Sequence, residues 1–285
     1  MMDNKAQRPF DEYLIQGEGT QKQRAEHWQI AIGLQDIDRL KNSSYLLDTA
    51  RQHIEGKLGI AEVQQRVVAY YQTQEGRRLA AAQGAEEADI VASHITEILA
   101  ERTFSFIPAS LAHLHRRLFA GVLEHAGDYR RVNLSKREWV LDGDSVIYAP
   151  YELLQETLDY DFRQERNVSY VGLSAVETVR HLAKFISGLW QIHPFMEGNT
   201  RTTAVFTIMY LRSFGFQASN EPFRDHSWYF RNALVRANYN NYALGISATT
   251  RFLERFFENL LLSGTHELRN RHCHIRWNEE PNVHD

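Results

Sequence analysis

The chain has 285 residues, of which 43% are apolar and 12% aromatic, with only 6 prolines and 16 glycines. This composition excludes a disordered or fibrous protein and predicts a packed globular protein with one main domain and an appendage. The net charge of -4, from 32 basic and 36 acidic residues, lacks the basic excess that nucleic-acid binding requires, so we expect no nucleic acid as a partner.

Targeting and anchoring signals are not found in the sequence. The first residues contain no apolar run of the kind a signal peptide needs, and no segment approaches the ~20 apolar residues of a membrane span. The single cysteine, Cys273, excludes an internal disulfide framework and is typical of a reducing compartment. We therefore expect a cytoplasmic protein that does not bind membranes.

The first part of the chain divides into an arm and a helical region. Residues 1–23 are polar and contain glycine and proline, so they predict an extended N-terminal arm. Residues 24–85 predict a small helical region, with helices from Arg24 to about residue 40, at about 44–55 and at about 60–73. Residues 74–87, rich in Gln, Glu, Ala and Arg, are the expected junction to the main domain.

The main domain is expected over residues 86–262, followed by a C-terminal tail at 263–285. Apolar periodicity predicts helices near 90–99, from Pro108, over 202–211, at about 225–240 and at about 247–262. Ser174 and Glu177 have the spacing of a capping box and open another helix, which we expect to end before Pro194. The one β signal is Glu138–Tyr148, where two β-prone runs flank Asp142-Gly143. The predicted fold class is all-α with one short β-hairpin.

The segment His193-Pro-Phe-Met-Glu-Gly-Asn-Thr-Arg201 joins two of these helices and carries the most chemistry. A helix N-terminus offers free N–H groups to phosphate, and Asn199 and Arg201 add an amide donor and a forked cation. Glu197 supplies one oxygen ligand of the kind that Mg²⁺ takes alongside water and phosphate, and His193 can act as a base near neutral pH. The segment predicts a phosphate and metal site with its own base; the alternative interpretation is a helix cap with a surface ion pair.

The same nine residues resemble the signature of the Fic (Fic/Doc) family, His-x-Phe-x-Asp/Glu-Gly-Asn-Gly-Arg-x-x-Arg. The resemblance covers roughly residues 88–262, because Leu114–Phe119, Ala126–Arg130, the hairpin and Tyr229–Ala233 also fall in the family's order. It implies transfer of AMP from ATP and Mg²⁺ to a Tyr, Ser or Thr hydroxyl of a target protein, with His193 as the base and Glu197 as the metal ligand. The implied nucleotide-binding residues are Phe195, Gly198, Asn199, Thr200, Arg201, Tyr229 and Asn232.

The resemblance also assigns a role to the predicted hairpin. In the family it is a flap to which an extended target segment adds as a strand, a mode of binding that demands little of the target's side chains. The implied docking residues are Val140, Leu141, Asp142, Gly143, Asp144, Ser145 and Val146. The target protein is not identified by the sequence, and a homo-oligomer is left open.

Two positions depart from the signature: its second glycine is Thr200 and its last arginine is Ala204. A methyl group cannot bind a γ-phosphate, so the alternatives are a Fic-type enzyme with another nucleotide donor, removal of AMP as the main reaction, or a regulatory binding module with little activity. Family members include bacterial toxins, secreted effectors and housekeeping regulators.

A further expectation concerns regulation. Many Fic proteins have a helix with Ser/Thr-x-x-x-Glu-Gly/Asn whose glutamate blocks productive ATP binding, and Arg51–Gly56 resembles it, with Glu55 at the glutamate position. The expected inhibitory contact is an ion pair of Glu55 with Arg201; the alternative is that Glu55 is a solvated helix end.

Overall fold

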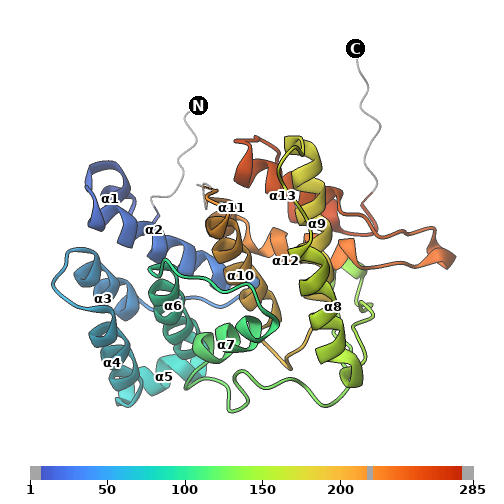
Figure 1. Ribbon diagram of the computed structural model, residues 1–285. Helices are drawn as coiled ribbons and strands as arrows, with labels where there is room; N and C mark the ends of the chain where they lie inside the picture. Colours follow the sequence, from blue (N-terminus) through green and yellow to red (C-terminus); the bar gives the residue numbers. More distant parts are fainter. Residues whose placement is uncertain (1–7, 217–220, 278–285) are drawn as a thin grey trace.

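The computed structural model describes residues 8–216 and 221–277, and these residues form an all-α protein (Figure 1). The elements of the first half are α1 (Asp11–Gln16), α2 (Thr20–Gly33), η1 (Leu34–Asp38), α3 (Ser44–Ile54), α4 (Ile60–Tyr71), α5 (Gln74–Gln83), α6 (Ala85–Leu99) and α7 (Pro108–Leu118). Those of the second half are η2 (Trp139–Leu141), η3 (Tyr151–Leu153), α8 (Leu154–Arg166), α9 (Ala175–Ile192), α10 (Asn199–Ser213), α11 (Glu221–Asp225), α12 (Ser227–Ala237), η4 (Tyr242–Leu244), α13 (Arg251–Leu261) and α14 (Asn270–Cys273). Among these helices none is both long and apolar enough to cross a membrane.

Helix α10 lies in the middle of the molecule, with α1 to α7 on one side and α8, α9, α12 and α13 on the other (Figure 1). All residues from Asn199 to Leu211 are buried, which agrees with a sequence that is apolar on nearly every face. The motif loop, His193–Arg201, therefore leads directly into the core of the protein.

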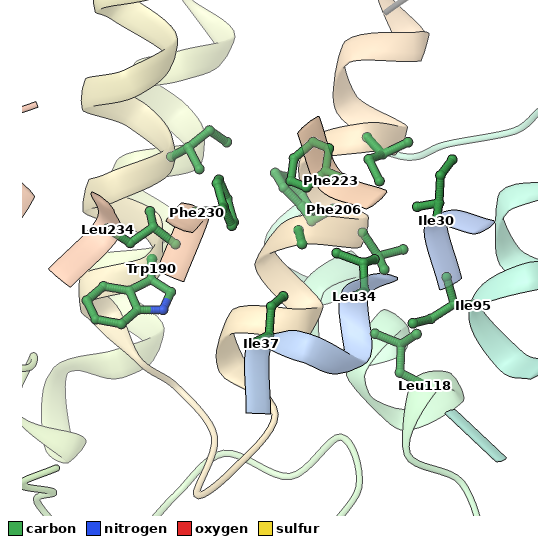
Figure 2. Close-up of a cluster of buried hydrophobic side chains, with 14 of the residues drawn as sticks. Ile30, Leu34, Ile37, Ile95, Leu118, Trp190, Phe206, Phe223, Phe230 and Leu234 are labelled. Carbon is green, nitrogen blue, oxygen red and sulfur yellow. The ribbon is translucent and has the colours of Figure 1, made fainter. Parts of the chain in front are cut away.

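The elements α1 to α5, here called the N-terminal unit, pack against the rest of the chain through α2 and η1. Helix α2 packs on α6 and α11, and η1 packs on α12 and α10. Figure 2 shows Leu34 and Ile37 beside α10, with Ile95 and Leu118 on neighbouring helices. Since Leu34, Ile37 and Ile95 are fully buried, the unit shares one apolar core with the main domain and places η1 next to the motif loop.

Two predictions about the N-terminal segments are wrong. The part of the arm that the structure describes is helical in α1, and Phe10 is buried ahead of it, because the aromatic ring joins the core. The expected junction at 74–87 forms α5 and the start of α6, since Ala, Gln and Arg favour helix and Thr73 caps the first turn. The described part of the tail packs on the domain, with Cys273 fully buried.

Other predictions are confirmed. The helices expected at 44–55 and 60–73 are α3 and α4, and the capping box of Ser174 and Glu177 has both of its hydrogen bonds. Helix α8 was not predicted from the sequence.

The predicted hairpin at 138–148 is wrong as a pair of strands, although its turn forms. Asp142 and Gly143 have φ of 57° and 90°, as the Asp-Gly signal predicts. However, Val140 and Leu141 lie in η2 and are both buried, whereas neighbouring residues of a strand face opposite sides. The Val140 carbonyl accepts a hydrogen bond from the N–H of Ile275 at 2.9 Å, so the tail takes the place of a partner strand.

Candidate active site

The motif loop starts where α9 ends. His193 is the C-cap of α9 and has φ of 51°, in the left-handed region, and Pro194 prevents the helix from continuing. The loop reverses the chain, and α10 begins at Asn199 after Gly198. The first turn of α10 thus presents backbone N–H groups that have no partner inside the helix, which makes this end suited to an anion.

A second histidine fixes the shape of the loop. The His115 ring stacks on Phe195 with ring centres 3.8 Å apart. Its Nδ1 accepts a hydrogen bond from the Gly127 N–H at 2.7 Å, so Nε2 carries the proton and donates to the Glu197 carbonyl at 3.1 Å. Burial lowers the pKa of His115 to about 4, so the imidazole that holds the loop is neutral at pH 7.

Two of the predicted nucleotide-binding residues, Phe195 and Asn199, stabilise the loop itself. The Asn199 side chain accepts from the Phe195 N–H at 3.0 Å and donates to the Phe195 carbonyl at 2.7 Å. Phe195 is fully buried. Both side chains therefore hold the loop closed, and a bound phosphate would meet backbone N–H groups first.

Gly198 allows a close approach to Phe119. Its φ is +72°, and a Cβ at this position would lie 2.4 Å from Cε2 and Cζ of the Phe119 ring. The guanidinium of Arg201 lies over the same ring at 4.8 Å. The glycine is thus required both by the backbone conformation and by the packing beneath the loop.

His193 is deeply buried at the start of the loop. Neither ring nitrogen has a hydrogen-bond partner among the described residues, and only 3% of the residue is exposed. Tyr148 stacks on the ring at 4.0 Å and Trp190 meets it edge-on at 5.3 Å, while Arg130 binds the His193 carbonyl at 2.7 Å. Burial, with the positive charge of Lys136 next in effect, lowers the pKa of His193 well below its usual value, so the ring is neutral.

Arg201 is buried and fully engaged at the other end of the loop. Its Nε forms an ion pair with Asp38 at 2.7 Å, Nη2 donates to Glu87, and Nη1 donates to the side chain of Gln35 at 3.2 Å. Only 4% of the Arg201 side chain is exposed. The N-terminal unit and the first turn of α6 thus hold this cation in place.

The expected ion pair of Glu55 with Arg201 is not present, so this prediction is wrong. Glu55 accepts a hydrogen bond from the Tyr13 hydroxyl at 2.6 Å and pairs with Lys57 at 2.5 Å. Asp38 and Glu87 occupy the expected position instead, because η1 rather than the end of α3 packs on α10.

Glu197 is the one carboxylate of the loop. Its side chain is exposed and makes no hydrogen bond or ion pair with the residues that the structure describes. One free carboxylate is the usual protein share of a Mg²⁺ site, because water and substrate phosphates supply the other ligands. Within 8–216 and 221–277, no group of three or more His, Cys, Asp or Glu side chains is placed so that it could hold a metal ion.

Thr200 and Ala204, where the signature has glycine and arginine, both face the protein interior. The Thr200 hydroxyl accepts a hydrogen bond from Trp190 Nε1 at 2.9 Å, and Ala204 is fully buried. Thr200 therefore fixes the indole beside His193, and the face of α10 at 204 is covered by other side chains.

Tyr229 and Asn232, expected near the nucleotide, lie against the C-terminal tail, so the structure does not bring them to the motif loop. Burial raises the pKa of the Tyr229 hydroxyl, which contacts Cys273, and Asn232 donates to Asn270 at 2.9 Å. The tail packs on this face of α12, and both side chains contact the tail instead of the motif loop.

The expected docking segment is partly covered as well. Val140, Leu141 and Val146 are buried, whereas Asp142, Gly143 and Asp144 are exposed at the turn and Ser145 is half-buried. Asp144 accepts from the Tyr239 hydroxyl at 2.7 Å, and Asp142 pairs with Arg276 of the tail. The exposed edge is therefore limited to the turn.

Sequence reasoning missed the charged groups that pair with Arg201 or lie around its partner Asp38. They are Asp38, Glu87, Lys136, Glu138 and Arg231. They come from four separate segments, since Lys136 and Glu138 lie two residues apart, and no spacing in the sequence connects the four.

Comparison with known proteins supports the sequence resemblance. Residues 105–211, from just before α7 to near the end of α10, match the model of the Fic/DOC family. No curated protein matches the chain. Residues 105–211 are therefore similar to the Fic/DOC family.

Solved structures of Fic proteins are similar to the chain at low sequence identity. A Fic family protein from Desulfovibrio desulfuricans has a TM-score of 0.53 at 15% identity, over 87% of this chain and 66% of that one, and it shows the common fold. The N-terminal Fic domain of Bep8, a VirB-translocated effector from a Bartonella species, has a TM-score of 0.49 at 20% identity, over 67% and 88%. BepC from Bartonella tribocorum, solved with bound AMPPNP, has a TM-score of 0.44 at 18% identity, over 67% and 89%.

Proposed function

We propose that the protein is an AMP transferase that moves AMP from ATP to a Tyr, Ser or Thr hydroxyl of a target protein. The observation that carries this proposal is the neutral His193 imidazole, whose two nitrogens have no hydrogen-bond partner among the described residues. His193 stands at one end of the motif loop, and Arg201 stands at the other. A neutral, unengaged imidazole is a base ready to accept a proton.

The residues of the loop divide the reaction between them. His193 takes the proton from the target hydroxyl, the hydroxyl oxygen attacks the α-phosphorus, and the bond to the β-phosphate breaks so that pyrophosphate leaves. The backbone N–H groups at the start of α10 bind the α-phosphate, and Arg201 binds the outer phosphates. Positioning and fixed charges supply most of the stabilisation in such transfers.

Glu197 would hold Mg²⁺ in this proposal, because it is exposed and directly precedes Gly198 at the start of α10. Bound there, the ion would neutralise phosphate charge.

The conformation described is a resting state in this proposal. Asp38 and Glu87 hold Arg201, and Tyr148 covers His193, so neither end of the loop meets a substrate as it stands. The N-terminal unit therefore inhibits the site through Asp38 of η1, and Glu87 of α6 assists it, in place of the expected Glu55.

Labelled ATP tests the proposal. Wild type, His193→Ala and the double variant Asp38→Asn/Glu87→Gln are incubated with Mg²⁺, a cell lysate and ATP labelled at the α- or the γ-phosphate. We expect protein-bound α-label that increases in the double variant and is lost when His193→Ala is added to it. Label from the γ-phosphate alone would replace the proposal with phosphotransfer.

A different donor is the second candidate, and Ala204 is the observation that favours it. A buried methyl provides no cation for a γ-phosphate from the motif itself. Competition of other nucleotides against α-labelled ATP in the same assay distinguishes the two candidates.

A further inference from the structure

Arg231 of α12 lies next to Arg201 across a single carboxylate. Oδ2 of Asp38 pairs with Arg201 Nε at 2.7 Å, and Oδ1 of the same group pairs with Arg231 Nη1 at 3.1 Å. The two guanidinium groups thus face each other across a gap that one small oxyanion fills.

Arg231 is held in this position from behind. Its Nη2 donates to both carboxylate oxygens of Glu138, at 3.1 and 3.2 Å. The guanidinium carbon also lies 5.4 Å from the centre of the Trp228 ring. Glu138 is almost fully buried, with 3% of its side chain exposed. Arg231 therefore keeps one edge fixed on Glu138 and presents the other edge to the gap.

The surroundings of the gap favour a negative ligand. Lys136 adds a third cation close by, and burial lowers its pKa, with the charge of Arg231 acting in the same direction. If Asp38 leaves, Arg201 keeps Glu87 and Arg231 keeps Glu138, but the edges of the two guanidinium groups that faced Asp38 lose their counter-charge beside the Lys136 ammonium. Like charges in such a place repel each other unless an anion replaces the carboxylate.

We infer that Arg231 is a second phosphate-binding residue of the nucleotide site, that it works with Arg201 in place of the arginine missing at position 204, and that Asp38 marks where a phosphate binds. Glu138 is a positioning residue that orients Arg231. This inference rests on the proposed function, because the anion it assigns to the gap is a β- or γ-phosphate of the nucleotide. The ligand class is a nucleoside di- or triphosphate, and a monophosphate would not reach the pair.

Binding measurements test the inference separately from transfer. Calorimetry with Mg²⁺ compares ATP, inorganic pyrophosphate and AMP on the full chain carrying Asp38→Asn, which frees the gap. Adding Arg231→Gln together with Glu138→Gln removes the cation without leaving a buried charge unpaired. Arg231→Lys keeps the charge and loses the fork, and Arg163→Gln, at an exposed arginine of α8, is the matched control.

We expect Arg231→Gln/Glu138→Gln to weaken ATP and pyrophosphate about 10- to 100-fold and AMP less than about 3-fold, with Arg231→Lys intermediate and the control unchanged. A thermal melt checks that each variant is folded. Equal ATP affinity with and without Arg231, or an equal loss for AMP and ATP, would overturn the inference.

The outcomes also separate the inference from the proposed function. If the Asp38→Asn protein binds neither ATP nor pyrophosphate, both are wrong. If binding follows the expected pattern but no AMP is transferred to any protein, the inference stands and the proposed reaction is wrong.

Discussion

Replacing Gly198 by alanine tests the description of the motif loop most sharply. The φ of +72° costs a residue with a Cβ about 1–2 kcal/mol. The added methyl would also lie 2.4 Å from two atoms of the Phe119 ring, and such overpacking costs about 1–3 kcal/mol. We therefore expect Gly198→Ala to lower the free energy of unfolding by about 2–5 kcal/mol, and the melting temperature by roughly 4–10 °C.

Urea denaturation followed by tryptophan fluorescence measures this change, since Trp190 lies beneath the loop. Gly188→Ala in α9 is the matched control. A Cβ at Gly188 meets only Asp161 Oδ2, at 3.8 Å, so this substitution should be neutral or stabilise the protein by up to about 1 kcal/mol. A loss below about 1 kcal/mol in Gly198→Ala, or an equal loss in the control, would refute the close approach to Phe119.

Three further predictions concern the environment of the loop and the N-terminal unit. Neutral His53 accepts a hydrogen bond from Trp28 Nε1 at 3.0 Å, and burial lowers its pKa to about 4, so the unfolded chain binds the proton more readily. Between pH 7.5 and 5 this histidine should contribute roughly 2 kcal/mol to the loss of stability, so urea denaturation of His53→Asn should show a pH-dependent loss smaller than that of wild type by this amount; equal losses in the two proteins would contradict the neutral, buried His53. Thr200→Val should cost about 1–3 kcal/mol in urea denaturation, because Trp190 loses its buried acceptor; no loss would contradict that hydrogen bond. Glu55→Gly should leave AMP transfer unchanged in the labelling assay, and a gain would mean that α3 rather than η1 inhibits the site.

The sequence predicts the fold well where the local structure depends only on residues a few positions apart. The capping box of Ser174 and Glu177, the periodicity of α3 and α4, and the apolar sequence of α10 each depend on residues a few positions apart. The His193–Arg201 segment was found for the same reason. Its position between two helices follows from Pro194 at one end and Gly198 at the other.

Tertiary packing decides the parts that the sequence could not predict. Asp38 and Arg231 are 193 positions apart and meet only because η1 packs on α12. Tyr229 was expected at the nucleotide because of its place in the family's order, but the tail packs on its side of α12. Likewise, Val140 bonds to the tail instead of to a partner strand. Each difference arises from a long-range contact that no local pattern encodes.

The most direct test of the central claim is mass spectrometry of the proteins modified in the presence of ATP and Mg²⁺. The account predicts AMP on a Tyr, Ser or Thr hydroxyl when the Asp38→Asn/Glu87→Gln protein is used, and none when His193→Ala is added to it. AMP adducts that persist without His193, or no adduct from a folded double variant that binds ATP, would contradict it.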